Sequence, residues 1–363
     1  MSIITAPPKY LPSDQAAPLP SGPRLSFSHR LPADSVHKTS AAEVLLTDAV
    51  RAGDGRFTVG AVWLRDRFLH HSGDGRSPDP LLLAETVRQA LICLSHRFHG
   101  VPQGHPFVLD RLDLELADGA APLRPGAPAH VTLDVTCART VTTPRRTGLA
   151  LEATASVDGV LIGRAGIRWE VLHPAFYQVV RYREARPEAG GAPEHPEAPL
   201  GPLRRLAPGE VGYPGDEHVL LARDSSGARG GFWLDPNPGH PVLFDHLSDH
   251  VPGMVLLEAF RQAGRALGAP LHPAGLSATF AAFAEPDVPV AITVTPGPDG
   301  PDGMDGTDGT DGMDRTDGPD GTDGPDGTDG TARMRTAEVT AAQRGVVLAT
   351  ARLAYPANRQ ETS

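Results

Sequence analysis

The chain has 363 residues, 40% of them hydrophobic, which is enough for two domains of ordinary size that each bury a core. Its net charge of −11 is concentrated in residues 299–330, where eleven Asp and one Arg give −10. The rest of the chain is therefore close to neutral. The sequence has no basic patch dense enough to indicate binding to nucleic acid or to an anionic membrane. We therefore expect neither as a partner.

The two cysteines, Cys93 and Cys137, occur in apolar segments without a second ligand at CxxC or CxxH spacing. They are typical of buried thiols in a reducing compartment. The N-terminal residues do not resemble a secretory signal, and no apolar run reaches the roughly 18 residues of a membrane span, so we expect a cytoplasmic protein. We expect neither a metal nor a cofactor, because HxH and HExxH spacings, a Walker A loop and a GxGxxG motif after a strand are absent.

Residues 1–36 are rich in proline, polar and aperiodic, which predicts a disordered arm. A first domain is expected over 37–181, with one helix at 79–97 and strands in which apolar and polar residues alternate. The turn VDGV predicts a hairpin between its last two strands. The expected strands of this domain are 43–48, 56–64, 106–117, 129–141, 146–158 and 159–171.

Residues 182–215 are dense in Pro, Gly, Ala and charge, which predicts a linker. The same order of elements then returns over 216–355, with a helix at 252–267, before a tail at 356–363. The expected strands of this second domain are 217–223, 230–235, 275–286, 288–296, 332–341 and 345–355. The two helices align without gaps at an offset of 173 residues, so the sequence predicts a duplicated α+β unit, each half a long helix against an antiparallel sheet.

The second domain is interrupted by residues 297–331, whose repeating unit is Gly-x-Asp. Glycine at every third place is also the pattern of collagen. However, Asp in each repeat would make three close-packed chains repel one another, and Arg315 breaks the glycine register. We therefore expect a disordered insertion, which the fold tolerates because the entropy of loop closure grows only slowly with loop length.

Both predicted helices place three polar residues in an otherwise apolar segment. They are Glu85, Arg88 and Gln89 in the first helix, and Glu258, Arg261 and Gln262 in the second. Each set falls within an arc of roughly 100° around its helix. One interpretation is an i,i+3 salt bridge at the edge of solvent, worth a few tenths of a kcal/mol. The repetition favours the other, in which the polar groups face a cavity.

The loop before the second helix, HPVLFDHLSDHVPGM, adds further candidates. We predict that His246 or His250 is the partner acid/base or an oxyanion donor, and that Asp249 is a substrate-binding residue. Either histidine alone is also typical of a solvated turn. The Pro-Gly entry to the helix at Gly253 leaves backbone amides free to face an anion or a developing oxyanion.

The segments DPLLLAETVRQA and DHVPGMVLLEAFRQA resemble the central helices of hotdog-fold thioester enzymes, among them the β-hydroxyacyl-carrier-protein dehydratases. As a pair they look like the two signature helices of the A-factor biosynthesis (AfsA) family of γ-butyrolactone proteins. The resemblance covers about 37–181 and 216–355. It implies a tandem hotdog fold, in which one chain forms the unit that single-copy relatives make by dimerising.

The family's implied reaction transfers a β-ketoacyl group from an acyl carrier protein to the hydroxyl of dihydroxyacetone phosphate. The resemblance makes Glu258 the first choice for the catalytic base, with Glu85 as its counterpart. Arg261 or Arg88 could hold the phosphate or, instead, lower the pKa of the neighbouring glutamate, while Gln262 and Gln89 could orient it or bind backbone. Because Arg67–Phe68 replaces the His240–Pro241 of the second copy, we expect the first site to be altered or inactive.

Two other function classes remain open from the sequence. A dehydratase or thioesterase of the same fold would release an enoyl product or a free acid without a phosphate-bearing acceptor. A non-catalytic protein would use the groove to bind acyl chains or butyrolactones for regulation.

Overall fold

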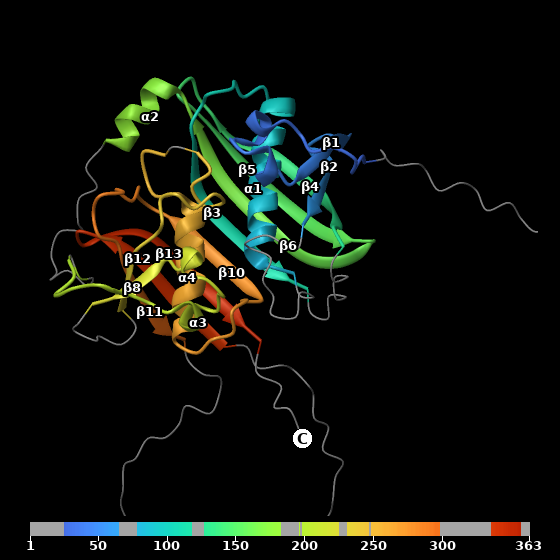
Figure 1. The fold of residues 1–363 in the computed structure, drawn as a ribbon. Helices are drawn as coiled ribbons and strands as arrows, with labels where there is room; N and C mark the ends of the chain where they lie inside the picture. The colour runs from blue at the N-terminus through green and yellow to red at the C-terminus, as the bar shows by residue number, and fades with distance from the viewer. Residues whose placement is uncertain are drawn as a thin grey trace, which may run out of the picture.

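The computed structural model describes residues 25–64, 78–117, 127–182, 196, 198–224, 231–246, 248–297 and 335–356. They form one antiparallel sheet of 13 strands with two long helices packed against it (Figure 1). Apart from Gly297, the predicted Gly-x-Asp insertion lies outside the described residues. No described helix is long and apolar enough to cross a membrane.

The two halves repeat the same order of elements, two strands, a long helix and four strands, which confirms the predicted duplication. The first half contains β1 (Leu46–Gly53), β2 (Arg56–Trp63), α1 (Pro80–His99), β3 (Phe107–Leu116), β4 (Ala129–Thr142), β5 (Arg146–Val157) and β6 (Val160–Leu172). The second contains β8 (Leu221–Arg223), β9 (Gly231–Leu234), α4 (Gly253–Ala266), β10 (Gly275–Phe280), β11 (Ala291–Pro296), β12 (Arg335–Gln343) and β13 (Val346–Tyr355).

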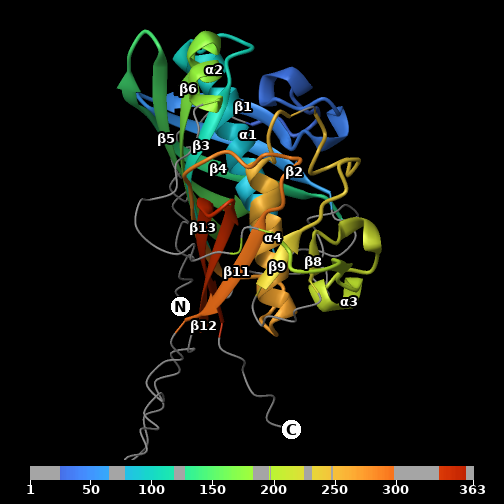
Figure 2. The same ribbon diagram turned by 90° about the vertical axis from the view of Figure 1, so that its left-hand side faces the viewer.

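The halves are joined edge to edge through β3 and β10. These strands pair antiparallel, with Leu114 opposite Leu276 and Leu112 opposite Ala278. The sheet therefore runs without a break in the order β1-β2-β4-β5-β6-β3-β10-β13-β12-β11-β9-β8-β7. Helices α1 and α4 contact one another, and the views in Figures 1 and 2 place the strands of each half around its own helix.

Helix α1 has clear sequence signals at both ends. The Asp79 side chain accepts a hydrogen bond from the Leu81 amide, Pro80 occupies the first turn, and Gly100 ends the helix with a φ of 63°. Between these ends almost every side chain is buried, so the helix depends on tertiary packing more than on solvent-exposed pairs.

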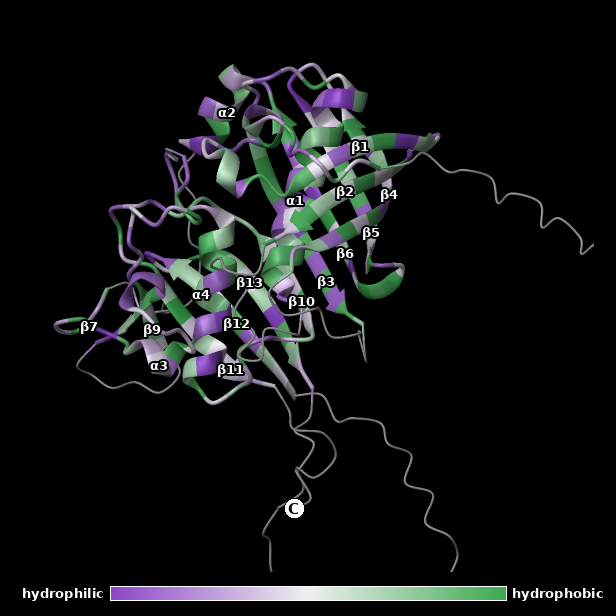
Figure 3. Cartoon of the chain, turned by 45° about the vertical axis from the view of Figure 1, so that its right-hand side comes forward, coloured by the Kyte–Doolittle hydropathy of each residue, from purple (hydrophilic) through white to green (hydrophobic). Residues whose placement is uncertain are grey.

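The strands follow the period-2 pattern, and Figure 3 shows hydrophobic and hydrophilic bands alternating along them. The predicted hairpin is present: Val157 pairs with Val160, and the turn residues Asp158 and Gly159 have φ values of 50° and 78°. Both cysteines are buried and free, as predicted.

Two predicted boundaries differ from the structure. Part of the predicted arm is ordered, because a short 3-10 helix, η1 (Ala33–Val36), buries Val36 completely. Part of the predicted linker is also ordered, where it forms β7 (Arg204–Arg205) and α3 (Pro208–Val211). Proline and glycine mark both segments as irregular, but local composition does not reveal that a few apolar side chains pack onto the core. One further helix, α2 (Pro174–Arg181), follows β6.

Because the sheet is continuous across β3 and β10, we expect Leu276→Ala to destabilise the whole chain. Leu276 is 3% exposed, and a Leu→Ala change in a core lowers the free energy of unfolding by about 2–5 kcal/mol. Leu200→Ala, at a side chain that is 85% exposed, should change it by less than about 0.5 kcal/mol. Urea unfolding followed by tryptophan fluorescence and circular dichroism measures both. Separate transitions for the two halves would contradict the coupling.

Candidate active site

A cavity of about 2150 Å³ lies between the two halves. Both long helices, both junction strands and the loop before α4 contribute to its wall. Among the lining residues are Leu82, Glu85, Arg88 and Ile92 of α1, Leu109 of β3, Gly253, Met254 and Leu256 of α4, and Phe280 of β10. The wall is more apolar than polar, and it also carries several charged side chains, as in pockets that bind small molecules.

The polar cluster is built around Glu85. Its two carboxylate oxygens accept hydrogen bonds from Arg88 Nε at 2.7 Å and Arg88 Nη2 at 2.8 Å. Gln89 Nε2 donates to Oε1 at 2.8 Å, and Lys38 Nζ lies 3.2 Å from the same oxygen. The side chains of Glu85 and Lys38 are only 7% and 6% exposed. The carboxylate is thus paired with two cations at the cavity wall.

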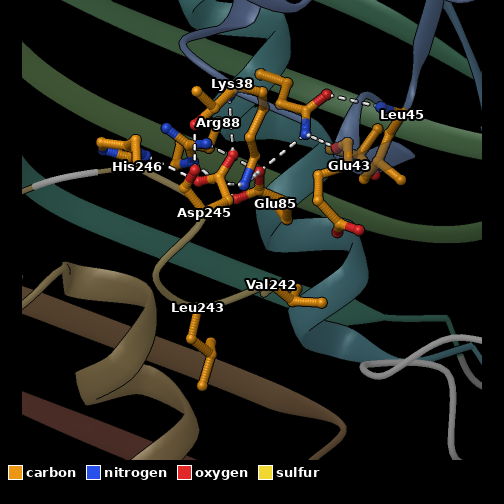
Figure 4. Close-up of polar contacts among 12 residues, drawn as sticks. Lys38, Glu43, Leu45, Glu85, Arg88, Val242, Leu243, Asp245 and His246 are labelled. Carbon is orange, nitrogen blue, oxygen red and sulfur yellow. Dashed lines mark hydrogen bonds and ion pairs between the residues drawn. The ribbon is translucent and has the colours of Figure 1, made fainter. Parts of the chain in front are cut away.

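The second half completes this cluster through Asp245, on the loop before α4 (Figure 4). Asp245 Oδ1 lies 3.5 Å from Lys38 Nζ, and Oδ2 accepts a hydrogen bond of 3.2 Å from the Thr39 amide. The Thr39 hydroxyl also donates to the Asp245 carbonyl oxygen. His246 Nδ1 lies 2.8 Å from Asp245 Oδ1. Two segments about 200 residues apart therefore meet over α1.

Charge decides the protonation state of Glu85. Burial by itself would raise its pKa, but the charges of Arg88 and Lys38, with hydrogen bonds from Arg88 and Gln89, hold the pKa well below its ordinary value of 4.5. The carboxylate is ionised at neutral pH and its oxygens are occupied.

Glu258 occupies the corresponding place on α4, but it is enclosed. It is 0% exposed and is not among the described residues that line the cavity. Tyr213 donates a hydrogen bond to its Oε1 at 2.8 Å, as does Gln262 Nε2 at 2.8 Å, and Arg261 Nη2 lies 2.6 Å from its Oε2. Burial raises the pKa of Glu258 even against the charge of Arg261.

Arg261 joins this buried group to the first half. Its Nη1 donates to both carboxylate oxygens of Asp79, at 3.0 and 3.2 Å, and its Nη2 also donates to the Tyr213 hydroxyl. Burial alone would lower the pKa of Arg261, but Asp79 and Glu258 raise it, so the guanidinium remains charged. The side chain is 1% exposed and has no contact with the cavity.

The two glutamines have matching roles. Gln89 accepts a hydrogen bond from the Leu45 amide at 2.8 Å and donates to the Glu43 carbonyl at 2.9 Å. Gln262 accepts from the Leu220 amide at 2.9 Å and donates to the His218 carbonyl at 2.7 Å. Each also donates to its own helix's glutamate. The glutamines thus orient the carboxylates and satisfy buried backbone groups.

The other predicted residues also lie on the cavity wall, with His246 in the Glu85 cluster beside Asp245. Asp249 accepts hydrogen bonds from the Tyr177 hydroxyl at 2.9 Å and pairs with His250 Nδ1 at 2.7 Å. His246 and His250 both line the cavity, as does Gly253 at the first turn of α4. Asp249 and both predicted histidines thus line the cavity, and each of them is bonded to a protein partner.

Several residues at these two centres carry no sequence signal. Lys38 and His37 precede the first strand in a short irregular segment, and Tyr213 lies in the predicted linker. Residue type and periodicity mark none of them, because their positions depend on contacts with distant segments. Among the described residues, no three His, Cys, Asp or Glu side chains are grouped as metal ligands.

The sequence matches the family described as "AfsA: A-factor biosynthesis hotdog domain" over residues 23–173 and 195–305. The chain belongs to the AfsA hotdog family. The tandem α+β architecture described above is therefore a double hotdog, as predicted from the two helices.

Relatives at least 31% identical cover about three quarters of the chain. A 2-oxo-3-(phosphooxy)propyl 3-oxoalkanoate synthase from Streptomyces virginiae is 35% identical over 274 residues, which are 74% of this chain and 88% of the relative. Synthases of the same name are 31% identical in Streptomyces coelicolor, over 74% of this chain and 83% of the relative, and in Streptomyces griseus, over 75% and 88%.

The two glutamates should give opposite pH dependences of stability. For Glu85, whose pKa is lowered in the folded state, the stabilisation is present above the unfolded value of 4.5 and is lost as pH falls below it. Glu85→Gln should therefore be less stable than wild type near neutral pH, and the deficit should shrink towards acid pH.

For Glu258, whose pKa is raised, the folded state loses stability as pH rises above 4.5. Glu258→Gln should therefore gain stability relative to wild type over the same rise in pH. Urea midpoints of wild type and both variants across the acid to neutral range test the pair. If the difference in urea midpoint from wild type changed with pH in the same way for both variants, the two glutamates would not have opposite pKa shifts.

Proposed function

We propose that this chain is an acyltransferase that joins a β-ketoacyl group to the hydroxyl of dihydroxyacetone phosphate. The relatives' name, 2-oxo-3-(phosphooxy)propyl 3-oxoalkanoate synthase, describes the ester that this reaction forms. The observation that carries the proposal is the pair of cations, Lys38 and Arg88, on the wall of a largely apolar cavity between the halves. Such a cavity can take an acyl chain and a phosphate together.

Lys38 and Arg88 are suited to hold the phosphate of the acceptor. Arg88 uses Nε and Nη2 on Glu85, and its Nη1 has no hydrogen bond among the described residues, so it could bind a phosphate oxygen. Lys38 can donate to a phosphate while Glu85 and Asp245 hold its side chain in place. Arg261 is a poor candidate for this role, because both of its Nη atoms are used on buried partners.

The thioester carbonyl is best accommodated at the start of α4. The N-cap residue Pro252 has no side chain that could occupy the first-turn amides, and Gly253 and Met254 line the cavity. A Cβ on Gly253 would lie 3.2 Å from the Phe280 ring and 3.3 Å from Leu109, so only glycine fits without displacing them. At the start of α1 the corresponding amide is already capped by Asp79.

Neither glutamate is well placed to act as the base. Glu85 is on the cavity, but its oxygens already accept hydrogen bonds from Arg88 and Gln89 and pair with Lys38, so they are not free to take the proton of a substrate. Glu258 has a raised pKa, but it is enclosed by protein. We therefore propose that Glu85 anchors the two cations, that a histidine on the cavity wall accepts the proton, and that the first-half glutamate rather than Glu258 belongs to the active centre.

An acyl carrier protein is proposed as the acyl donor, because a thioester on a long flexible arm can enter a cavity that the carrier itself cannot. The predicted cytoplasmic location is consistent with such a donor, and both remain proposals. No cofactor is required, since acyl transfer from a thioester is balanced by proton transfer alone.

The reaction is tested with purified protein, a β-ketoacyl carrier protein, and dihydroxyacetone phosphate present or absent. Mass spectrometry should detect the ester only with the acceptor. Free acid or enoyl product without the acceptor would instead identify a thioesterase or a dehydratase, and unaltered thioester would favour a binding protein.

Lys38→Met should raise the KM for dihydroxyacetone phosphate by about 10–100-fold, the effect of losing a charge-assisted hydrogen bond of about 1.5–3 kcal/mol. With unphosphorylated dihydroxyacetone the wild type and the variant should differ little, because neither can use a phosphate contact. Steady-state kinetics with both acceptors measures the difference, with the thermal midpoint as a control for folding. An equal loss with both acceptors would argue against a phosphate role.

A further inference from the structure

We propose that His37 is the catalytic base that accepts the proton of the attacking hydroxyl, and that His96 is the positioning residue that fixes its tautomer. This inference rests on the proposed acyl transfer and names the proton acceptor that it requires. His37 was not predicted from the sequence. Its role follows from its place on the cavity wall and from a chain of hydrogen bonds behind it.

The backbone turn at His37 brings two consecutive side chains to the cavity. His37 ends η1 in the left-handed conformation, with φ 52° and ψ 49°. His37 and Lys38 both line the cavity, and Lys38 contacts Glu85. Arg88 lies near enough for its charge to lower the pKa of His37, so the imidazole is close to a cation that we propose for the phosphate. A left-handed φ is uncommon outside glycine, but histidine adopts it more often than most residues, as asparagine and aspartate do.

The hydrogen bonds behind His37 determine which of its nitrogens is basic. His96 Nδ1 lies 2.8 Å from the Val101 carbonyl oxygen, which can only accept, so His96 Nδ1 carries a proton. His96 Nε2 lies 2.9 Å from His37 Nε2. With both rings neutral, His96 Nε2 is bare and His37 Nε2 donates to it. His37 Nδ1 then keeps its lone pair, and it has no hydrogen-bond partner among the described residues.

The surroundings of His37 keep the ring neutral. Its ring centroid lies 4.8 Å from that of Phe107 in an edge-on contact and 5.0 Å from that of His96. Burial lowers the pKa of His37 to about 4, with further contributions from His96, Arg88 and His246. At neutral pH a lone pair is therefore available without prior loss of a proton.

The other candidates on the wall are less suitable. Glu85 has its oxygens occupied by Arg88, Lys38 and Gln89. His246 is oriented by Asp245, but its side chain is 46% exposed, at the solvent side of the cluster. His250 pairs with Asp249 and packs on Phe283, beyond the Lys38 cluster.

The proton and the electrons balance within one cycle. The hydroxyl oxygen of the acceptor forms a bond to the thioester carbonyl carbon as its proton passes to His37 Nδ1. The tetrahedral intermediate then collapses, the C–S bond breaks, and the imidazolium returns the proton to the departing sulfur. The products are the ester and the free thiol of the carrier, with His37 restored to its starting state.

His37→Asn tests the base directly, because asparagine tolerates the left-handed backbone. We expect kcat to fall by about 10²–10⁴-fold, with the KM for dihydroxyacetone phosphate changed by only a few fold. His130→Asn, an exposed residue on β4, is the matched control and should retain wild-type kcat. A His37→Asn enzyme that is folded and within about twofold of wild type would overturn the proposal.

The pH profile separates a proton acceptor from a structural residue. In wild type, kcat/KM should fall at acid pH with an apparent pKa of about 4. The residual kcat/KM of His37→Asn should not show this acid-side decrease. The charged or titratable groups that lower the pKa of His37 are His96, Arg88 and His246. Replacing Arg88 with a neutral residue should therefore raise the apparent pKa of the acid-side decrease. An unchanged acid-side decrease of kcat/KM in His37→Asn would overturn the proposal.

Two variants at His96 test its positioning role. In His96→Gln the amide oxygen can still accept from His37 Nε2, so the kcat should be within about tenfold of wild type. In His96→Phe the acceptor for His37 Nε2 is lost, so the proton of His37 can occupy either ring nitrogen. The kcat should then fall further than in His96→Gln, with little change in KM. Equal activities of the two variants would remove His96 from the mechanism.

Nitrogen NMR of the histidine rings tests the tautomers without any assay. We expect a proton on His37 Nε2 and on His96 Nδ1 in the full-length protein at neutral pH. If wild type forms no ester, the proposed function fails while this result can stand. If wild type forms the ester but His37 carries its proton on Nδ1, the base assignment alone fails.

Discussion

Burial of one glutamate on each central helix is the constraint on which the arrangement of the two centres depends. An ionised carboxylate removed from water is strongly unfavourable unless cations and hydrogen bonds compensate it. Each helix supplies the first compensation itself, an arginine at i+3 and a glutamine at i+4. The remaining partners must come from elsewhere in the chain, and here the two halves differ.

The same motif reaches opposite electrostatic outcomes. Glu85 gains a second cation, Lys38, so charge outweighs burial and the carboxylate stays ionised. Glu258 shares its arginine with Asp79 in a fully buried group, so burial outweighs charge and its pKa rises. The first centre remains on the cavity, whereas Glu258 in the second is fully buried and bonded to Tyr213. A duplicated sequence has thus produced one accessible centre and one enclosed network.

Each centre is completed by the opposite half. Asp245 of the second half reaches Lys38 beside Glu85, and Asp79 of the first half reaches Arg261 beside Glu258. The continuous sheet through β3 and β10 holds the halves in the register that these contacts need. Neither half alone contains all the residues of either centre. This gives a physical reason for joining two hotdog units in one chain.

The sequence by itself determined the repeated helix-and-sheet order, the two Glu-x-x-Arg-Gln sets and the Pro-Gly entry to α4, because these follow from periodicity and local backbone preference. It did not identify Lys38 or His37, nor the hydrogen bond from Tyr213 to Glu258, since those residues act only through contacts with distant segments. Which glutamate faces the cavity was likewise decided by tertiary structure. Desolvation and neighbouring charge depend on what surrounds a side chain in space, and identical local motifs carry no information about that difference.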